Sequence, residues 1–339
     1  MVADAGVPGS PGVRSESGRV RGMRSGGAES ERAVGTGDSR RGRARSAPPG
    51  GSAGPHPVAA RAGPPPFLQS LPRILIIRPG STAIEVQRRH GDYDRWFRDA
   101  LAEHDLAFDL CDATRAAIPD ASAHVGVIVT GSVKSVASPE PWMEGLAAFL
   151  RRAEHAGVPV LAVCFGCQAL AWARGGRVIR SPSGWELGAV EVNLTGEGRL
   201  DRLFEGLPWP LPVLATHEDR VETLPPGAVL LAGNDCAPVQ AFRIGESVWG
   251  VQFHPEATVA ILRELILLRR EALEAGAGAR ARAAAGPAAA GHAAAGPAAA
   301  GHVETLLGRL EGFDPAPQRR LLDNFVRICL RDREPGRPM

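Results

Sequence analysis

Cys164 is the residue of this sequence best placed for nucleophilic chemistry. It ends the apolar run from Val158 to Val163 and is followed at once by a segment with helical character. Small residues stand two positions before and after it, Ala162 and Gly166, and they permit the sharp strand-to-helix turn of a nucleophile elbow. A helix N-terminus favours the thiolate form of a cysteine and offers the backbone N–H of Phe165 to a developing oxyanion.

A second polar motif follows another apolar run, from Val248 to Phe253. It consists of His254 and, two residues later, Glu256. Residues i and i+2 of an extended chain face the same side. Glu256 can therefore accept a hydrogen bond from one imidazole nitrogen and orient the other toward Cys164, with His254 as general base. The two motifs together predict a Cys-His-carboxylate triad.

Two other interpretations of Cys164 stay open at this point. Free cysteine is among the most buried residue types, so Cys164 could be a structural thiol. Cys164 and Cys167 also form a Cys-x-x-Cys sequence at a helix start, a spacing typical of thioredoxin-like redox pairs. A redox pair leaves the elbow spacing, Gln168 and the separate His-Pro-Glu motif unexplained. A redox or non-catalytic protein on the same fold is the alternative from a different function class.

The two motifs, Cys-x-Gly-x-Gln at 164–168 and Gln-Phe-His-Pro-Glu at 252–256, resemble those of class I glutamine amidotransferases. The resemblance covers about residues 73–270 and is greatest to stand-alone members similar to the glutaminase domain of GMP synthase. It implies an α/β, flavodoxin-like fold whose mostly parallel central sheet is flanked by helices. Comparable patches occur at Thr130-Gly-Ser132, at 184–188, at His217-Glu-Asp219 and at 224–228.

The resemblance also implies a reaction. Cys164 would attack the γ-carboxamide carbon of glutamine, and His254, oriented by Glu256, would protonate the departing ammonia. Water would then release glutamate from a γ-glutamyl thioester on Cys164.

Further site residues follow from the same resemblance. Gln168 would hydrogen-bond the substrate, and His217 would lie near the amino-acid end of the substrate. Gly131 and Ser132 would supply the second oxyanion N–H beside that of Phe165. Many members of the family carry Gly-Gly-Pro where this chain has Gly131 followed by Ser132.

The fate of the ammonia is a separate question. No Gly-x-x-x-x-Gly-Lys-Ser/Thr loop occurs, so we expect no fused synthetase and a separate synthetase or acceptor subunit as partner. Hydrolysis of another γ-glutamyl amide is the alternative. We expect no cofactor and no metal, since His292 and His302 of the tandem decapeptide at 283–302 have no carboxylate or thiol nearby.

The elements that position these residues begin at Arg73. Strand-like runs at 73–78, 108–111, 125–130 and 158–163 alternate with helical segments at 93–104, 142–155 and 168–174, as in βαβ units. Shorter strand-like segments follow at 177–180, 189–194, 212–216, 228–232, 239–244 and 248–253, and helices are expected at 258–274 and 318–331. One α/β domain is therefore expected over 72–332.

The segments outside this pattern are poor in large apolar side chains, and residues 1–66 hold almost none. Residues 1–71 are rich in Gly, Pro and Arg and cannot bury enough apolar surface to offset their ordering entropy, so we expect a disordered tail. The same holds for 333–339. Two Gly-Pro pairs interrupt the alanine-rich stretch at about 277–302, which we interpret as a low-complexity insertion.

Composition limits the function classes. The 339 residues are 44% hydrophobic, enough for a sizeable core, and the formal net charge of +2 gives no general attraction to nucleic acid. No apolar run reaches the roughly 18–20 residues of a membrane-spanning helix. The five cysteines are an odd number, thinly spread and without a signal-peptide pattern, so we expect a cytoplasmic protein.

Overall fold

The computed structural model describes residues 71–153, 155, 157–276 and 301–331. Contacts divide the chain after Gly63, and every described residue lies in the second unit, Pro64–Met339. The expected tail at 1–71, apart from Leu71, and the expected end at 333–339 lie outside the described residues. So does the expected insertion at 277–302, except for its last two residues, where His302 begins helix α8 (His302–Leu310).

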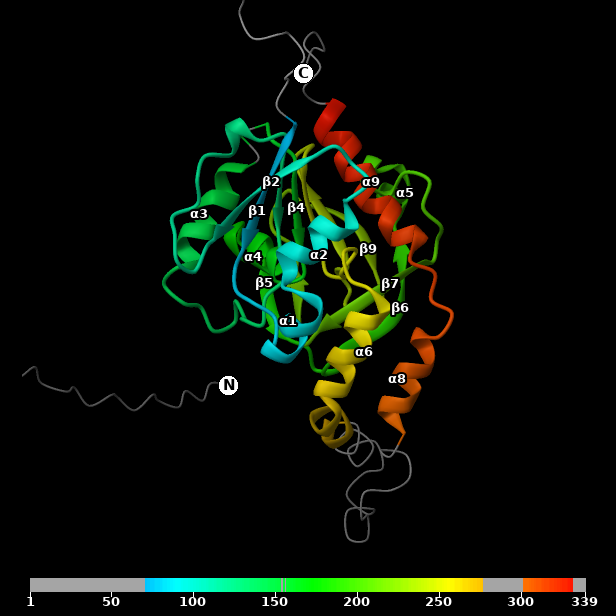
Figure 1. Cartoon of the computed structure of the whole chain (residues 1–339). Helices are drawn as coiled ribbons and strands as arrows, with labels where there is room; N and C mark the ends of the chain where they lie inside the picture. Colours follow the sequence, from blue (N-terminus) through cyan, green and yellow to red (C-terminus); the bar gives the residue numbers. More distant parts are fainter. Residues whose placement is uncertain (1–70, 154, 156, 277–300, 332–339) are drawn as a thin grey trace, which may run out of the picture. The chain divides into compact units, whose positions relative to one another are not determined.

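The described residues form an α/β fold around a nine-stranded mixed sheet (Figure 1). Its strand order is β2-β1-β3-β4-β11-β10-β9-β6-β7. The first five pair in parallel: β2 (Ala107–Asp112), β1 (Arg73–Arg78), β3 (Gly126–Val129), β4 (Val160–Val163) and β11 (Val248–Val251). The other four pair antiparallel: β10 (Ala241–Ile244), β9 (Val229–Gly233), β6 (Glu186–Leu194) and β7 (Leu211–His217). The expected α/β architecture is confirmed, with parallel pairing confined to the half that carries Cys164.

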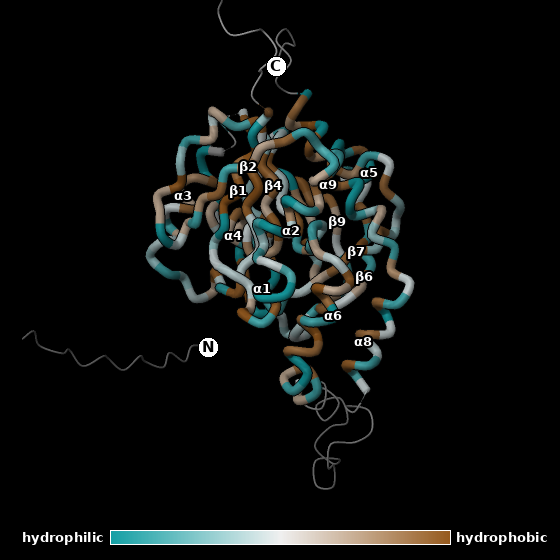
Figure 2. Tube along the Cα trace, in the orientation of Figure 1, coloured by the Kyte–Doolittle hydropathy of each residue, from teal (hydrophilic) through white to brown (hydrophobic). Residues whose placement is uncertain are grey.

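Strand β1 shows why the parallel strands read as continuous apolar runs. Ile74 and Ile76 pack into one layer, with Phe97 of α2 (Tyr93–Ala100) and Phe325 of α9 (Ala316–Arg331). The residues between and after them pack into the opposite layer, with α3 (Met143–Ala153) and α4 (Phe165–Ala173). Because helices cover both faces, every side chain at the centre of the strand is apolar and buried. Figure 2 shows this concentration of hydrophobic residues along the central strands.

A third apolar cluster covers the antiparallel half of the sheet. Helices α1 (Ile84–His90), α6 (Val259–Leu268) and α8 pack together with Leu187 of β6 and Leu214 of β7. In place of one helix over 258–274, α6 ends at Leu268, and 270–276 form a separate short helix after Arg269. Thr258 caps the start of α6 by accepting a hydrogen bond from the Ile261 N–H at 3.3 Å.

The remaining elements are short. Strands β5 (Arg177–Arg180) and β8 (Asp219–Thr223) form a separate antiparallel pair. Helix α5 spans Gly196–Leu200, and 3₁₀ turns occupy Ala121–Ala123 and Arg202–Phe204. Sequence patterns did not predict α1, α8 or β8. No helix in the described ranges is long and apolar enough to cross a bilayer.

Candidate active site

The sharp turn between β4 and α4 places Cys164 at its apex. Cys164 has φ 51° and ψ −103°, and among the described residues no other non-glycine has a positive φ. Such a backbone costs about 1–3 kcal/mol and persists only where the surrounding structure holds it. The residue is 5% exposed, and its Sγ lies 3.9 Å from the Thr216 carbonyl oxygen. The chain thus presents the thiol at the carboxyl edge of the parallel strands, as an elbow requires.

Gly166 permits the close packing beneath this turn. A Cβ at Gly166 would lie 2.5 Å from the carbonyl oxygen of Val129 in β3. Any side chain there would push α4 away from the sheet. The small residue two positions after Cys164 is therefore a steric requirement of the elbow.

His254 and Glu256 follow β11, the strand that pairs in parallel with β4. His254 Nδ1 and Glu256 Oε1 are 2.7 Å apart, and the two residues are only 1% and 2% exposed. Burial acts to lower the pKa of His254, but the negative charge of Glu256 and the charge and hydrogen bond of Cys164 outweigh it. The net effect raises the pKa of His254 to about 10. His254 therefore holds a proton at neutral pH, between the carboxylate and the sulfur.

A cavity of about 180 Å³ opens beside Cys164. Ser132, Gln168 and His217 line it, as do residues that the sequence analysis did not select as site residues: Tyr93, Trp185 and Arg269. The structure thus brings together Cys164 and three of the residues implied by the family resemblance.

Gly131 and Phe165 contribute backbone next to the thiol. A Cβ at Gly131 would lie 2.8 Å from His254 Cε1 and 3.1 Å from Tyr93 Cε1, so this loop packs directly on the imidazole. Phe165 is the first residue of α4, where backbone N–H groups have no partner within the helix. Ser132 uses its hydroxyl within the protein: it donates to the carbonyl of Pro79, just after β1, at 3.0 Å and accepts from the Lys134 N–H at 3.0 Å.

Gln168 connects the elbow helix α4 to the start of β8 and to Gln252. Its Nε2 donates to the Asp219 carbonyl at 2.9 Å and to Gln252 Oε1 at 3.2 Å. Gln168, which the resemblance implies for substrate binding, lines the cavity, and its amide nitrogen is engaged within the protein.

His217 lies in the cavity wall with both ring nitrogens facing protein oxygens. Nδ1 is 3.0 Å from the Asp219 carbonyl, and Nε2 is 2.8 Å from Glu186 Oε2. Burial acts to raise the pKa of Glu186, but the hydrogen bond and charge of His217 and amide donors from Asn234 and Gln240 lower it. His217 thus holds the end of β7 in place.

Tyr93 is a site residue that sequence analysis missed. Its ring stacks on that of His254, with the centroids 6.2 Å apart and the planes inclined by 17°. Burial is the main reason that the pKa of Tyr93 is raised, so its hydroxyl stays protonated. The ring covers His254 and limits the water that reaches it.

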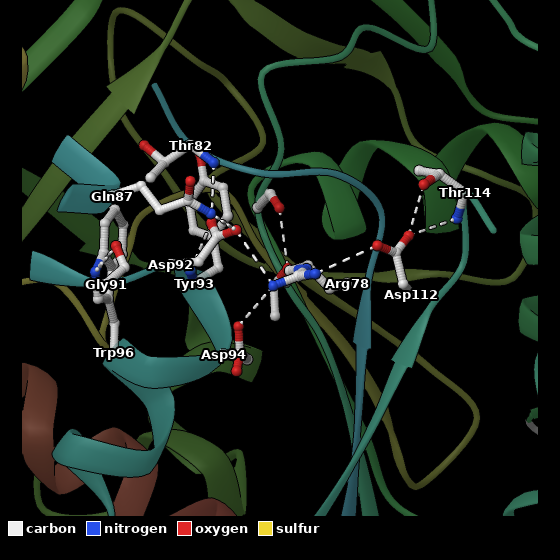
Figure 3. Close-up of polar contacts among 12 residues, drawn as sticks. Arg78, Thr82, Gln87, Gly91, Asp92, Tyr93, Asp94, Trp96, Asp112 and Thr114 are labelled. Atoms are coloured by element: carbon white, nitrogen blue, oxygen red, sulfur yellow. Dashed lines mark hydrogen bonds and ion pairs between the residues drawn. The ribbon is translucent and has the colours of Figure 1, made fainter. Parts of the chain in front are cut away.

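Asp92 fixes the position of Tyr93 (Figure 3). As the N-cap of α2, its Oδ1 accepts from the N–H groups of Tyr93 at 3.0 Å and Thr82 at 2.9 Å. Its Oδ2 accepts from Gln87 Nε2 at 2.9 Å and from Arg78 Nη1 at 3.2 Å. An aspartate immediately before a helical segment is the sequence signal that could have led to Tyr93.

Cys167 differs from Cys164 in its surroundings. It is fully buried, and burial holds the pKa of its thiol well above the usual range. Reactive cysteines need thiolate character and access, so this environment argues against a Cys164–Cys167 redox pair. In the described ranges no three His, Cys, Asp or Glu side chains are grouped to hold a metal ion.

Comparison with known proteins places this site in a family. The family model described as glutamine amidotransferase class-I matches residues 93–268, just over half of the chain. The chain belongs to the class I glutamine amidotransferases. The resemblance inferred from the Cys164 and His254 motifs is thereby confirmed.

This amidotransferase is similar both to γ-glutamyl peptidases and to GMP synthases. Gamma-glutamyl peptidase 3 of Arabidopsis thaliana is 27% identical over 187 residues, which cover 53% of this chain and 75% of the relative. GMP synthase of Thermosipho melanesiensis is 42% identical over 105 residues, but these cover 31% of this chain and 20% of the synthase. The similarity to the peptidase therefore extends over far more of the relative's length.

Solved structures agree on the fold of the amidotransferase. A glutamine amidotransferase from Thermotoga maritima has a TM-score of 0.56 at 20% identity, covering 77% of this chain and 99% of that one. A second, from Methylobacillus flagellatus, has a TM-score of 0.55 at 24% identity, covering 80% and 99%.

Proposed function

We propose that this amidotransferase hydrolyses γ-glutamyl amides through a thioester on Cys164. The proposal rests on one observation. The strained elbow cysteine lies beside a buried His254, and His254 is hydrogen-bonded to Glu256. The thiolate sulfur of Cys164 attacks the γ-carbonyl carbon, and the C–N bond breaks as the protonated His254 gives its proton to the departing nitrogen. Water then attacks the thioester, returns a proton to His254 and releases glutamate, which restores the cysteine.

The oxyanion of each tetrahedral intermediate needs hydrogen-bond donors that are already in place. We assign this role to the N–H of Phe165, at the start of α4, and to the N–H groups of the loop at Gly131 and Ser132. The proximity of Gly131 to His254 supports this assignment, because the same loop then borders both the proton donor and the carbonyl.

The first candidate substrate is glutamine, with ammonia passing to a separate acceptor protein. The second candidate is a substituted γ-glutamyl amide, such as a γ-glutamyl peptide. The extent of the similarity to the γ-glutamyl peptidases favours the second candidate, since those relatives match over three quarters of their length.

A product assay tests the proposal. The full chain is incubated with L-glutamine or with γ-glutamyl-glycine, and glutamate, ammonia and free glycine are quantified. Glutamate from glutamine supports the first substrate, and faster release of glycine supports the second. Glutamate formation from neither compound would refute the proposed function.

Replacing Gly131 with alanine tests the loop. The added Cβ would meet His254 Cε1 at 2.8 Å, so either the imidazole or the loop must shift. We expect kcat/KM for the better substrate to fall about 10- to 100-fold, because ångström-scale misplacement of catalytic groups costs about that much. Gly145→Ala is the matched control, since a Cβ there meets nothing within 4 Å. Equal rates for the two variants would show that the loop does not constrain His254.

A further inference from the structure

Arg269 presents a cationic group to the Cys164 cavity. It is the C-cap residue of α6 and is half-buried. Its Nη1 donates to the Leu265 carbonyl at 3.3 Å, and its Cζ lies 4.6 Å from the centroid of the Trp185 ring. A guanidinium has five N–H donors, so these contacts leave most of its hydrogen-bonding capacity unused.

The other cations of the cavity differ from Arg269 because carboxylates accompany them. Lys134 Nζ lies 2.8 Å from Glu140 Oε1, and Arg180 Nη2 lies 3.4 Å from Glu218 Oε2. Across the described ranges, no carboxylate lies within ion-pair distance of Arg269. Among the described residues, therefore, no counter-ion contacts the guanidinium of Arg269.

Arg269 keeps its charge despite this setting. Burial lowers the pKa of its guanidinium, while the nearby acidic groups of Tyr93, Cys164 and Glu218 act in the opposite direction. Arginine stays protonated in proteins. A partly desolvated cation without a counter-ion is energetically costly, so this position favours an anionic ligand.

We infer that Arg269, stacked on Trp185, binds a carboxylate group of the substrate. The inference rests on the proposed function, because the ligand is the γ-glutamyl compound that presents its amide to Cys164. The planar guanidinium matches a carboxylate with two parallel hydrogen bonds, and the Trp185 ring limits its orientation. Arg269 is then a specificity-determining residue for the reaction.

Two carboxylates of a γ-glutamyl compound could fill this site. One is the α-carboxylate of the glutamyl group, which glutamine also has. The other belongs to the leaving amine when that amine is an amino acid. Four probes separate them: L-glutamine, glutamine α-amide, γ-glutamyl-methylamide and γ-glutamyl-glycine.

Binding to the Cys164→Ala protein is measured for each probe by isothermal titration calorimetry, with and without Arg269→Gln. This comparison needs no turnover, so it stays informative if the wild-type protein fails to release glutamate. Arg270→Gln is the matched control: it changes the next residue, a partly exposed arginine that pairs with Glu274 and Glu304. Arg269→Lys keeps the charge without the planar fork, and thermal unfolding checks that each variant is folded.

We expect Arg269→Gln to weaken binding of the recognised probes about 10- to 100-fold, the usual worth of a hydrogen-bonded charge. Loss for every probe except glutamine α-amide assigns Arg269 to the α-carboxylate. Loss for γ-glutamyl-glycine alone assigns it to the leaving group. In either case the affinity of the Arg269→Lys protein should lie between those of the protein with Arg269 and of the Arg269→Gln variant. Equal losses for all four probes, no loss for any, or no measurable binding by any probe would overturn the inference.

Discussion

Replacing Cys164 with alanine is expected to abolish glutamate release, while Cys167→Ser keeps most of it. Alanine removes the sulfur that forms the thioester, so the covalent route is lost and the rate should fall on the order of 10⁴-fold or more. Cys167 is fully buried and its thiol has a raised pKa, so it cannot take over the reaction. Cys167→Ser should instead lower stability by about 1–2 kcal/mol, because a hydroxyl replaces a buried thiol.

Covalent labelling identifies the nucleophile independently of turnover. A glutamine-mimicking electrophile should modify Cys164 in the wild-type protein and in Cys167→Ser, but not in Cys164→Ala. Peptide mapping by mass spectrometry locates the label. A label on Cys167, or full activity in Cys164→Ala, would contradict the assignment of the elbow cysteine.

The parallel half of the fold could be predicted because burial on both faces leaves a direct pattern in sequence. Ile74 and Ile76 face one helical layer while Leu75 and Ile77 face the other, so the strand reads as an uninterrupted apolar run. The elbow was equally visible. Its requirements are local, namely an apolar strand, small neighbours such as Gly166 and a helix directly after Cys164.

Strand β8 and helix α8 were harder to predict. Strand β8 is short and has no strong apolar period, whereas its partner β5 lies where a strand was expected, at 177–180. Helix α8 begins at His302, where the repetitive alanine-rich sequence ends, and its apolar face is defined only by packing against α6 and β6. These elements depend on tertiary contacts that no local pattern records.

The residues of the site also divide into those marked by a local sequence pattern and those placed by tertiary contacts. His254 and Glu256 were predictable since their spacing in an extended chain puts both on one side. Tyr93 reaches the imidazole because Asp92 and Arg78 fix the start of α2, and this network joins segments separated in sequence. Arg269 reaches the cavity from the end of a helix, about a hundred residues after Cys164 in sequence, and no motif marks it.

Removing His254 should reduce the rate of glutamate formation about 10²- to 10⁴-fold, the usual contribution of general acid–base catalysis. Glu256→Gln should have a smaller effect, since an amide oxygen can still accept from Nδ1 but the charge that stabilises the imidazolium is gone. The substitution is nearly isosteric. The second oxygen, Oε2, has no hydrogen-bond partner in the described structure, so the added NH₂ displaces no existing contact.

The pH dependence of Glu256→Gln and a double mutant test whether Glu256 acts through His254. The negative charge of Glu256 helps to raise the pKa of His254, so removing that charge lowers this pKa. The basic limb of the kcat/KM profile, where His254 loses the proton it gives to the leaving group, should therefore move to lower pH in Glu256→Gln. The double variant His254→Ala/Glu256→Gln should be scarcely slower than His254→Ala alone, because residues that act as a unit are not additive. If the losses of the two single variants multiply in the double variant, and the basic limb of Glu256→Gln does not move, then Glu256 works independently of His254. The triad assignment would have to be abandoned.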